Sequence, residues 1–218
     1  AGGHVLAAVF LKDGKQRVML FRHAKGAWTR RELPLKSRVA ALEISSSGNL
    51  VAMAGEGGDV QLYRPEEPAF EKHWTPPAKV TALTTTTVSE AVAVGCADGS
   101  VWILGVSEER PPKRVGDVSG AVTRLLIQAQ ERLIIAGSKE GEVRRLAVLN
   151  PADHRLMIKM PGEVTAISHS GNAMLAVGDS LGNVACITDQ VETLPVTHLH
   201  DSAITAVTPS RPAVRGAS

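Results

Sequence analysis

The sequence of 218 residues is poor in aromatic side chains and in cysteine. It holds 3 Phe, 3 Trp and 1 Tyr, together 3% of the chain, and only 2 Cys. A hydrophobic core built from this sequence must therefore consist mainly of Val, Leu, Ile and Ala. So few cysteines exclude a small disulfide-rich scaffold, and a chain of this length can bury about 70% of its unfolded surface without one. Cys96 and Cys186 lie in apolar runs, which predicts two reduced thiols.

Other absences narrow the class of protein. No apolar run approaches the roughly 20 residues that cross a bilayer, so we expect no membrane span. None of the 4 Asn begins an Asn-x-Ser/Thr sequon, and the sequence has no signal-peptide pattern. With 44% hydrophobic and 21% charged residues, the composition excludes a disordered chain. These features predict a folded intracellular protein, cytoplasmic or nuclear.

Motifs that carry chemistry are also missing. The sequence has neither a phosphate-binding loop nor a Gly-x-Ser-x-Gly nucleophile elbow. The tightest cluster of metal-binding residue types is His198-x-His200 followed by Asp201, and no further His or Cys is placed to complete a site. We interpret His198 and His200 as structural residues. The sequence therefore predicts no enzyme and no catalytic, cofactor-binding or metal-binding residues.

The charge is unevenly distributed along the chain. The net charge of +2 combines residues 1–38, with 9 basic and 2 acidic side chains (+7), and residues 39–218, with 15 basic and 20 acidic side chains (−5). The first 38 residues are thus a basic sector of an otherwise acidic protein. Such a sector favours an acidic protein surface or a nucleic-acid backbone as partner.

A short motif of the type Val-Thr-Ala-Leu recurs along the chain. Its copies are spaced by 41, 42, 42 and 40 residues: Val39–Leu42, Val80–Leu83, Val122–Leu125, Val164–Ile167 and Ile204–Val207. Each of the first four is followed by a second apolar run, a glycine-containing turn, a third apolar run and a variable fourth one. Three of the turns fit the pattern Gly-x-x-x-Gly-x-Val. They are Gly95–Val101, Gly137–Val143 and Gly178–Val184.

Each apolar run is short and bounded by turn residues, which is typical of β-strands rather than helices. Each repeat is therefore predicted to be a meander of four antiparallel strands. A sheet of about 40 residues cannot bury both of its faces alone, and stacking such sheets around an axis, as in a β-propeller, solves this problem.

These repeats resemble the WD-repeat family of β-propellers over nearly the whole chain. Family repeats of about 40–45 residues end the third strand with Trp-Asp. The Trp position here stays apolar, with Phe21, Tyr63, Leu104, Leu146 and Ile187, but the following Asp is replaced by Arg22, Arg64, Gly105, Ala147 and Thr188. Of the family's Gly-His before the first strand, only His200 remains. The resemblance implies a divergent WD40-like propeller that rests on aliphatic packing.

The fold class we predict is all-β, a propeller of four-stranded antiparallel blades in a single domain, residues 1–218. Four blades are complete: approximately 39–75, 80–118, 122–160 and 164–199. Residues 5–33 match the second to fourth strands of a further blade, and residues 203–208 match a first strand. These two segments can share one blade and close a ring of five. The alternative is an incomplete propeller, part of a larger one.

The propeller resemblance implies a non-catalytic protein–protein interaction scaffold within a larger intracellular assembly, because propellers offer wide loop faces without built-in chemistry. The alternative is an RNA- or ribosome-associated propeller that binds an anionic backbone through its basic N-terminal sector. For either partner the candidate residues are Lys12, Lys15, Arg17, Arg30 and Arg31. We also expect the loops between second and third strands to form an acidic face, with Asp59, Asp98 and Asp179 among their residues.

Overall fold

The chain is an all-β protein built from five antiparallel sheets. A computed structural model describes residues 4–86, 91–107, 110–128, 132–170, 174–188 and 195–209. Four sheets have four strands and one has three, and consecutive strands pair in each. This confirms the predicted fold class of four-stranded antiparallel blades. The only helix in the described residues is the short 3-10 turn η1 (Pro151–Asp153), and no helix there is long and apolar enough to cross a membrane.

The sheets follow one another along the chain. The first holds β1 (His4–Lys12), β2 (Lys15–Ala24) and β3 (Ala27–Leu33). The second holds β4 (Val39–Ile44), β5 (Val51–Gly55), β6 (Val60–Arg64) and β7 (Glu67–Trp74). The third holds β8 (Val80–Thr85), β9 (Ala91–Cys96), β10 (Ser100–Gly105) and β11 (Lys113–Asp117). The fourth holds β12 (Val122–Gln128), β13 (Leu133–Ser138), β14 (Glu142–Ala147) and β15 (Arg155–Lys159). The fifth holds β16 (Val164–Ser170), β17 (Met174–Asp179), β18 (Asn183–Thr188) and β19 (Thr197–His198).

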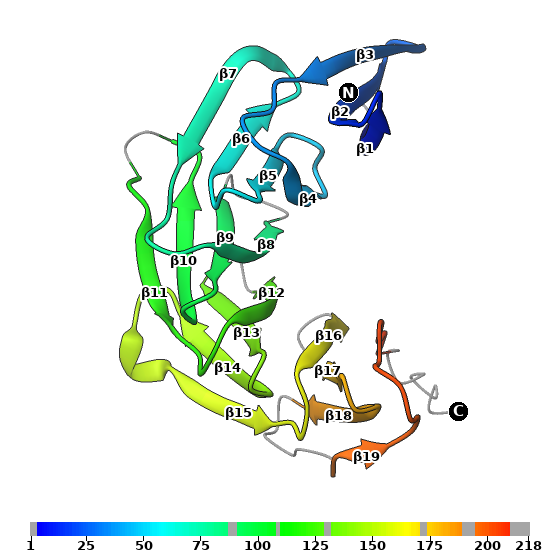
Figure 1. Ribbon diagram of the computed structural model, residues 1–218. Helices are drawn as coiled ribbons and strands as arrows, with labels where there is room; N and C mark the ends of the chain where they lie inside the picture. The colour runs from blue at the N-terminus through cyan, green and yellow to red at the C-terminus, as the bar shows by residue number, and fades with distance from the viewer. Residues whose placement is uncertain are drawn as a thin grey trace, which may run out of the picture.

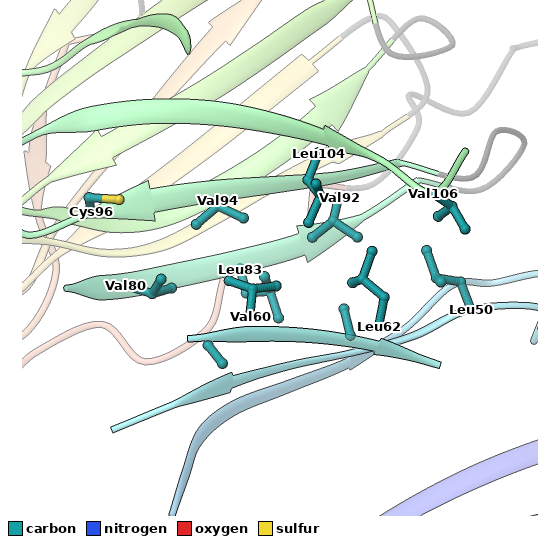
Figure 2. Packing of buried hydrophobic residues seen from close by; sticks show 12 residues of the cluster. Leu50, Val60, Leu62, Val80, Leu83, Val92, Val94, Cys96, Leu104 and Val106 are labelled. Atoms are coloured by element: carbon teal, nitrogen blue, oxygen red, sulfur yellow. The ribbon is translucent and has the colours of Figure 1, made fainter. Parts of the chain in front are cut away.

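The sheets stack side by side in an open arc, with β4, β8, β12 and β16 on its inner side and β7, β11 and β15 on its outer side (Figure 1). A separate hydrophobic cluster fills each of the four spaces between neighbouring sheets. Figure 2 shows one of them, where Leu50, Val60 and Leu62 of the second sheet meet residues of the third, such as Val92 and Leu104. Aliphatic packing between sheets therefore replaces the aromatic core that the sequence lacks.

Each inner strand begins with a β-bulge in its repeat motif, and the bulged residue is Thr in β8, β12 and β16 and Ala40 in β4. The register shifts between Val80 and Ala82, and equivalently in β12 and β16. The bulge lets the Thr123 hydroxyl reach the carbonyl oxygen of Val164 at 2.6 Å, the first residue of the next motif. The same bond, also at 2.6 Å, joins Thr165 to Ile204. The motif thus couples the fourth sheet to the fifth, and the fifth sheet to the segment that follows it.

The second glycine of Gly-x-x-x-Gly-x-Val occupies a left-handed turn position. Gly141 has a φ of 78°, and a Cβ there would lie 2.3 Å from the carbonyl oxygen of Met160. At the position that holds Trp in WD repeats, Tyr63, Leu104, Leu146 and Ile187 are buried, and Phe21 is half-buried. The turn and the apolar position therefore have the structural roles that the repeat predicts.

Of the two arrangements that the sequence leaves open, the structure has the open one. β1 pairs only with β2 among the described residues, and residues 203–208 form no strand with it. Ile204 instead lies against the fifth sheet, where its backbone N–H donates to the carbonyl oxygen of Asp179 at 2.9 Å. The blade expected to combine residues 5–33 with residues 203–208 is therefore not assembled, because the two segments lie at opposite ends of the arc (Figure 1).

Candidate interaction surface

One face of the first sheet is covered by no other sheet in the described part of the chain. Val18, Leu20 and Leu33 turn their side chains toward the second sheet, so their neighbours along each strand point the other way. We call these neighbours the N-terminal face: Leu6, Ala8, Phe10, Arg17, Met19, Phe21, His23, Trp28, Arg30 and Glu32. The face is mixed, with an apolar majority and two arginines.

Leu6 and Phe21 of the N-terminal face occupy positions that are buried in every other sheet. Leu6 pairs across the strands with Phe21. The equivalent pairs are Val51–Tyr63, Val92–Leu104, Ile134–Leu146 and Leu175–Ile187, and all eight of those side chains are buried against the preceding sheet. Leu6, by contrast, is 55% exposed, Phe10 38% and Trp28 61%. The N-terminal face thus has the composition of a sheet–sheet contact and lacks its covering sheet.

Charged side chains surround the apolar residues of the N-terminal face. Arg17 forms an ion pair with Glu32, with Nη1–O distances of 3.0 and 3.1 Å. Arg30, Lys12 and Phe10 line a hollow of about 460 Å³ together with that pair. Neither Lys12 nor Arg30 has an acidic partner among the residues that the structure describes. The hollow therefore offers two unpaired cations beside apolar side chains.

The structure separates the five predicted site residues. Lys12, Arg17 and Arg30 lie together around the hollow. Lys15, which is opposite Lys12 in the β1–β2 hairpin, lines a second hollow of about 470 Å³ with Lys36 and Arg38. Arg31 follows Arg30 on the same strand, so its side chain points to the opposite face, toward the second sheet.

The first sheet is anchored to the second by polar contacts. The Tyr63 hydroxyl lies 3.0 Å from the carbonyl oxygen of Pro34, 3.0 Å from Oε1 of Gln61 and 3.3 Å from Oε1 of Glu71. Burial raises the pKa of Tyr63, and the charge of Glu71 raises it further, so the phenol stays protonated and donates. Gln16 adds a bond from its Nε2 to the carbonyl oxygen of Val39 at 3.2 Å. The bonds at Pro34, just after β3, and at Gln16 on β2 thus link the first sheet to the second.

Of the three aspartates expected on the acidic face, Asp98 is exposed, Asp59 is half-buried and Asp179 is buried at the start of a turn. Asp179 is 0% exposed. Its Oδ1 accepts from the N–H groups of Leu181 and Asn183 at 2.9 and 2.8 Å. Its Oδ2 accepts from Gly162 N at 3.0 Å and Asn183 Nδ2 at 2.9 Å. Burial alone would raise the pKa of Asp179, but these hydrogen bonds outweigh it and hold the pKa below its usual 3.8.

The other two aspartates also make local bonds. Asp59 accepts from the Ser37 hydroxyl at 2.8 Å and from Nε2 of Gln61 at 3.0 Å. Asp98 accepts from the backbone N–H of Ser100 at 3.0 Å. A one-dimensional sequence shows that these aspartates lie in turns, but it does not show which backbone groups they meet. Asp179 in particular is a structural carboxylate that stabilises the last complete hairpin.

His198 has the local partners of a structural histidine. Its Nδ1 lies 3.3 Å from Oδ1 of Asn183, and its Nε2 lies 3.3 Å from Oδ1 of Asp201. Over the described residues, no group of three or more His, Cys, Asp or Glu side chains is placed to hold a metal ion. Cys96 and Cys186 are both free thiols, the first buried and the second half-buried.

A larger hollow of about 800 Å³, which sequence analysis did not identify, lies between the third and fourth sheets. Its lining includes Ile103, Pro112, Val148 and the cations Arg110 and Arg132. The sequence signal for it is weak: Pro111-Pro112 follows one strand, and Arg132 precedes a strand of the next repeat. Only the stacking of the two sheets brings these segments together.

No protein-family model and no curated protein matches this sequence. Among solved structures, the chain is similar to the computationally designed protein Ika8, with a TM-score of 0.70, 17% identity and coverage of 97% of this chain and 67% of that one. It is also similar to the β-propeller domain of Cps50 (Swd1) from Myceliophteria thermophila, with a TM-score of 0.68, 13% identity and coverage of 79% and 59%. The designed protein Ika4 matches 62% of this chain and 82% of its own, with a TM-score of 0.51 and 19% identity.

At these identities the similarities establish the fold alone: the sheets are arranged as in a β-propeller. The chain matches only 59% of the length of the Cps50 propeller domain, which agrees with an arc that does not close.

Proposed function

We propose that this protein is a non-catalytic, WD-repeat-like interaction scaffold of a larger intracellular assembly, and that the N-terminal face is where a protein partner binds. The observation that carries the proposal is the Leu6–Phe21 pair, in which Leu6 is 55% exposed and Phe21 half-buried, whereas its equivalents are buried in the four other sheets. An apolar strand face of this kind is typical of a contact with another polypeptide. The free thiols of Cys96 and Cys186 favour a reducing compartment.

The charges of the face indicate the chemistry of the partner. Lys12, Arg17 and Arg30 surround the apolar residues, with Glu32 as the acidic group beside them. A matching partner presents apolar side chains together with carboxylates, because opposite charges at the rim accelerate association and suppress wrong partners.

One observation favours RNA as a second candidate. Trp28 and Phe10 are exposed on the same face as Arg17 and Arg30, and aromatic rings beside cations can stack on unpaired bases. The exposed aromatic rings are few and Arg17 is already paired with Glu32, so we place protein first.

Reversing the charge of the face separates these proposals. We expect the triple variant Lys12→Glu, Arg17→Glu, Arg30→Glu to lose stoichiometric partners at least tenfold in co-purification, because like charges then face the partner's carboxylates. The matched control reverses three exposed cations elsewhere, Arg124→Glu, Arg132→Glu and Lys139→Glu, and should retain the partners. Circular dichroism checks that both variants are folded. Equal retention by both variants would contradict the proposed surface.

The same pair of variants tests RNA binding with a labelled single-stranded oligonucleotide. If three phosphate contacts form, the logarithm of the binding constant should fall with a slope of about −2 against the logarithm of salt concentration, and the N-terminal variant alone should lose binding. A flat salt dependence would exclude the RNA alternative and leave the protein proposal standing.

A further inference from the structure

The segment Ile204–Val207 lies where the first strand of a following sheet would begin. Its contacts repeat those of β12 and β16 with the sheets before them. A Cβ on Gly95 would lie 2.4 Å from Val122, a Cβ on Gly137 would lie 2.6 Å from Val164, and a Cβ on Gly178 would lie 2.4 Å from Ile204. With the bond from Thr165 to Ile204, this segment is docked as a first strand whose own sheet is missing from the described residues.

The first sheet lacks the inner strand that the Ile204–Val207 segment resembles. Each of the other four sheets begins with an inner strand carrying the repeat motif, whereas the first begins with β1, which matches a second strand. In the third sheet, Leu83 pairs with Val94 and Thr84 with Ala93. The equivalent register would pair Val207 with Ala8 and Thr208 with Ala7. Among the described residues one edge of β1 has no partner strand, and unpaired edges recruit strands from other chains.

The face of the fifth sheet that points away from the fourth sheet, and likewise the N-terminal face, is more exposed than the equivalent faces of the other sheets. Val60, Val101 and Val143 are fully buried against the following sheet, whereas their equivalent Val184 in the fifth sheet is only half-buried. The N-terminal face has the corresponding excess exposure on its side, at Leu6 and Trp28. The two ends of the arc therefore carry the two halves of one sheet–sheet contact.

The charges of the two ends are opposite. Residues 160–209 contain no Lys or Arg and five acidic residues, Glu163, Asp179, Asp189, Glu192 and Asp201, and thus carry −5. Residues 1–38 carry +7. Among the described residues of segment 160–209, Asp179 is buried, whereas the exposed Asp201 and the half-buried Glu163 offer carboxylates to a basic surface.

We propose that the partner of the N-terminal face is a second copy of this chain, whose fifth sheet covers the face and whose Ile204–Thr208 segment adds to the edge of β1. This inference rests on the proposed function and names the partner of the same surface. A second copy is favoured over closure within one chain because the arc is open and the two ends lie apart (Figure 1). Such a head-to-tail contact joins unlike surfaces, so it builds closed rings or longer chains of copies.

The decisive experiment mixes two single-cysteine variants. In a background with Cys96→Ala and Cys186→Ala, one variant carries Ala7→Cys and the other Thr208→Cys. Neither variant can form the predicted disulfide alone, whether within a chain or between identical copies. We expect a disulfide-linked dimer in the mixture and only background dimer in each separate sample. Absence of the heterodimer in the mixture, with both variants folded, would overturn the proposal.

A second measurement tests the face by light scattering coupled to size exclusion. We expect the wild type to rise in mass with concentration, and Leu6→Glu to raise the dissociation constant at least tenfold, as should high salt. The control Leu156→Glu changes a strand leucine of similar exposure, 50%, on β15 and should associate like the wild type. A wild-type monomer at every concentration would overturn the second-copy partner. The proposed function would then still stand if the triple charge reversal released another stoichiometric protein, and would fail if it released none.

Discussion

The Asp179→Ala variant should lose about 3 kcal/mol or more of unfolding free energy at neutral pH. The substitution leaves four donors without their acceptor: the N–H groups of Gly162, Leu181 and Asn183, and the Asn183 amide. Donors deprived of their partner in the interior cost about 1–3 kcal/mol each unless water reaches them. Urea unfolding followed by circular dichroism measures the loss.

The control for this prediction is Asp201→Ala, because the side chain of Asp201 is fully exposed and its ion-pair partner is His198. We expect its effect to stay within about 0.5 kcal/mol. Equal stability of the Asp179→Ala variant and the wild type would refute the structural role of this carboxylate.

The same carboxylate makes stability depend on pH. Because the folded pKa of Asp179 lies below the unfolded value of 3.8, its contribution is fully present above that value and is lost as pH falls through the folded pKa. Hydrogen bonds likewise lower the pKa values of Asp98 and Glu142, so they act in the same direction. The stability difference between wild type and Asp179→Ala should therefore shrink below pH 3.8.

The Gly137→Val variant should lose about 3 kcal/mol, because it places a side chain where two sheets meet. A Cβ at this position would lie 2.6 Å from Cγ1 of Val164 and 2.8 Å from Cδ1 of Ile167. Unlike the turn glycines, Gly137 does not have a positive φ, so the cost arises from the contact and not from the backbone. Thermal and urea unfolding would both show the loss.

Gly57→Val is the matched control. Gly57 also lacks a positive φ, is exposed, and would place its Cβ at an ordinary 3.6 Å from Asp59. We expect a cost below about 1 kcal/mol there. Similar losses at Gly57 and Gly137 would show that the close approach of the sheets is not what requires glycine.

The repeat made most of the sheet layout predictable. The Val-Thr-Ala motif marks the inner strand with its bulge, and the Gly-x-x-x-Gly-x-Val pattern marks the tight hairpin that follows. These local patterns were enough to predict four sheets. The blade predicted over residues 164–199 ends in β19, which covers only Thr197–His198, and residues 189–194 before it lie outside the described part of the chain. That strand carries no recurrent motif.

The candidate site was less predictable for two different physical reasons. Arg30 and Arg31 were grouped by charge, although alternation along a strand places neighbours on opposite faces, so the sequence did contain the information that separates them. The burial of Asp179 depends on Gly162, which is 17 residues away and reaches the carboxylate only after the sheet forms. Ring closure depends on contacts between the two ends of the arc, for which no local pattern exists.

Amide hydrogen exchange along β1 tests the central claim that the first sheet provides the binding surface. In an isolated chain, the N–H groups of His4–Lys12 that point away from β2 have no partner strand among the described residues and should exchange fast. When the protein is concentrated enough to associate, we expect these amides to become protected while those of β11 on the outer side of the arc do not change. Unchanged exchange along β1, with new protection only elsewhere, would contradict the account.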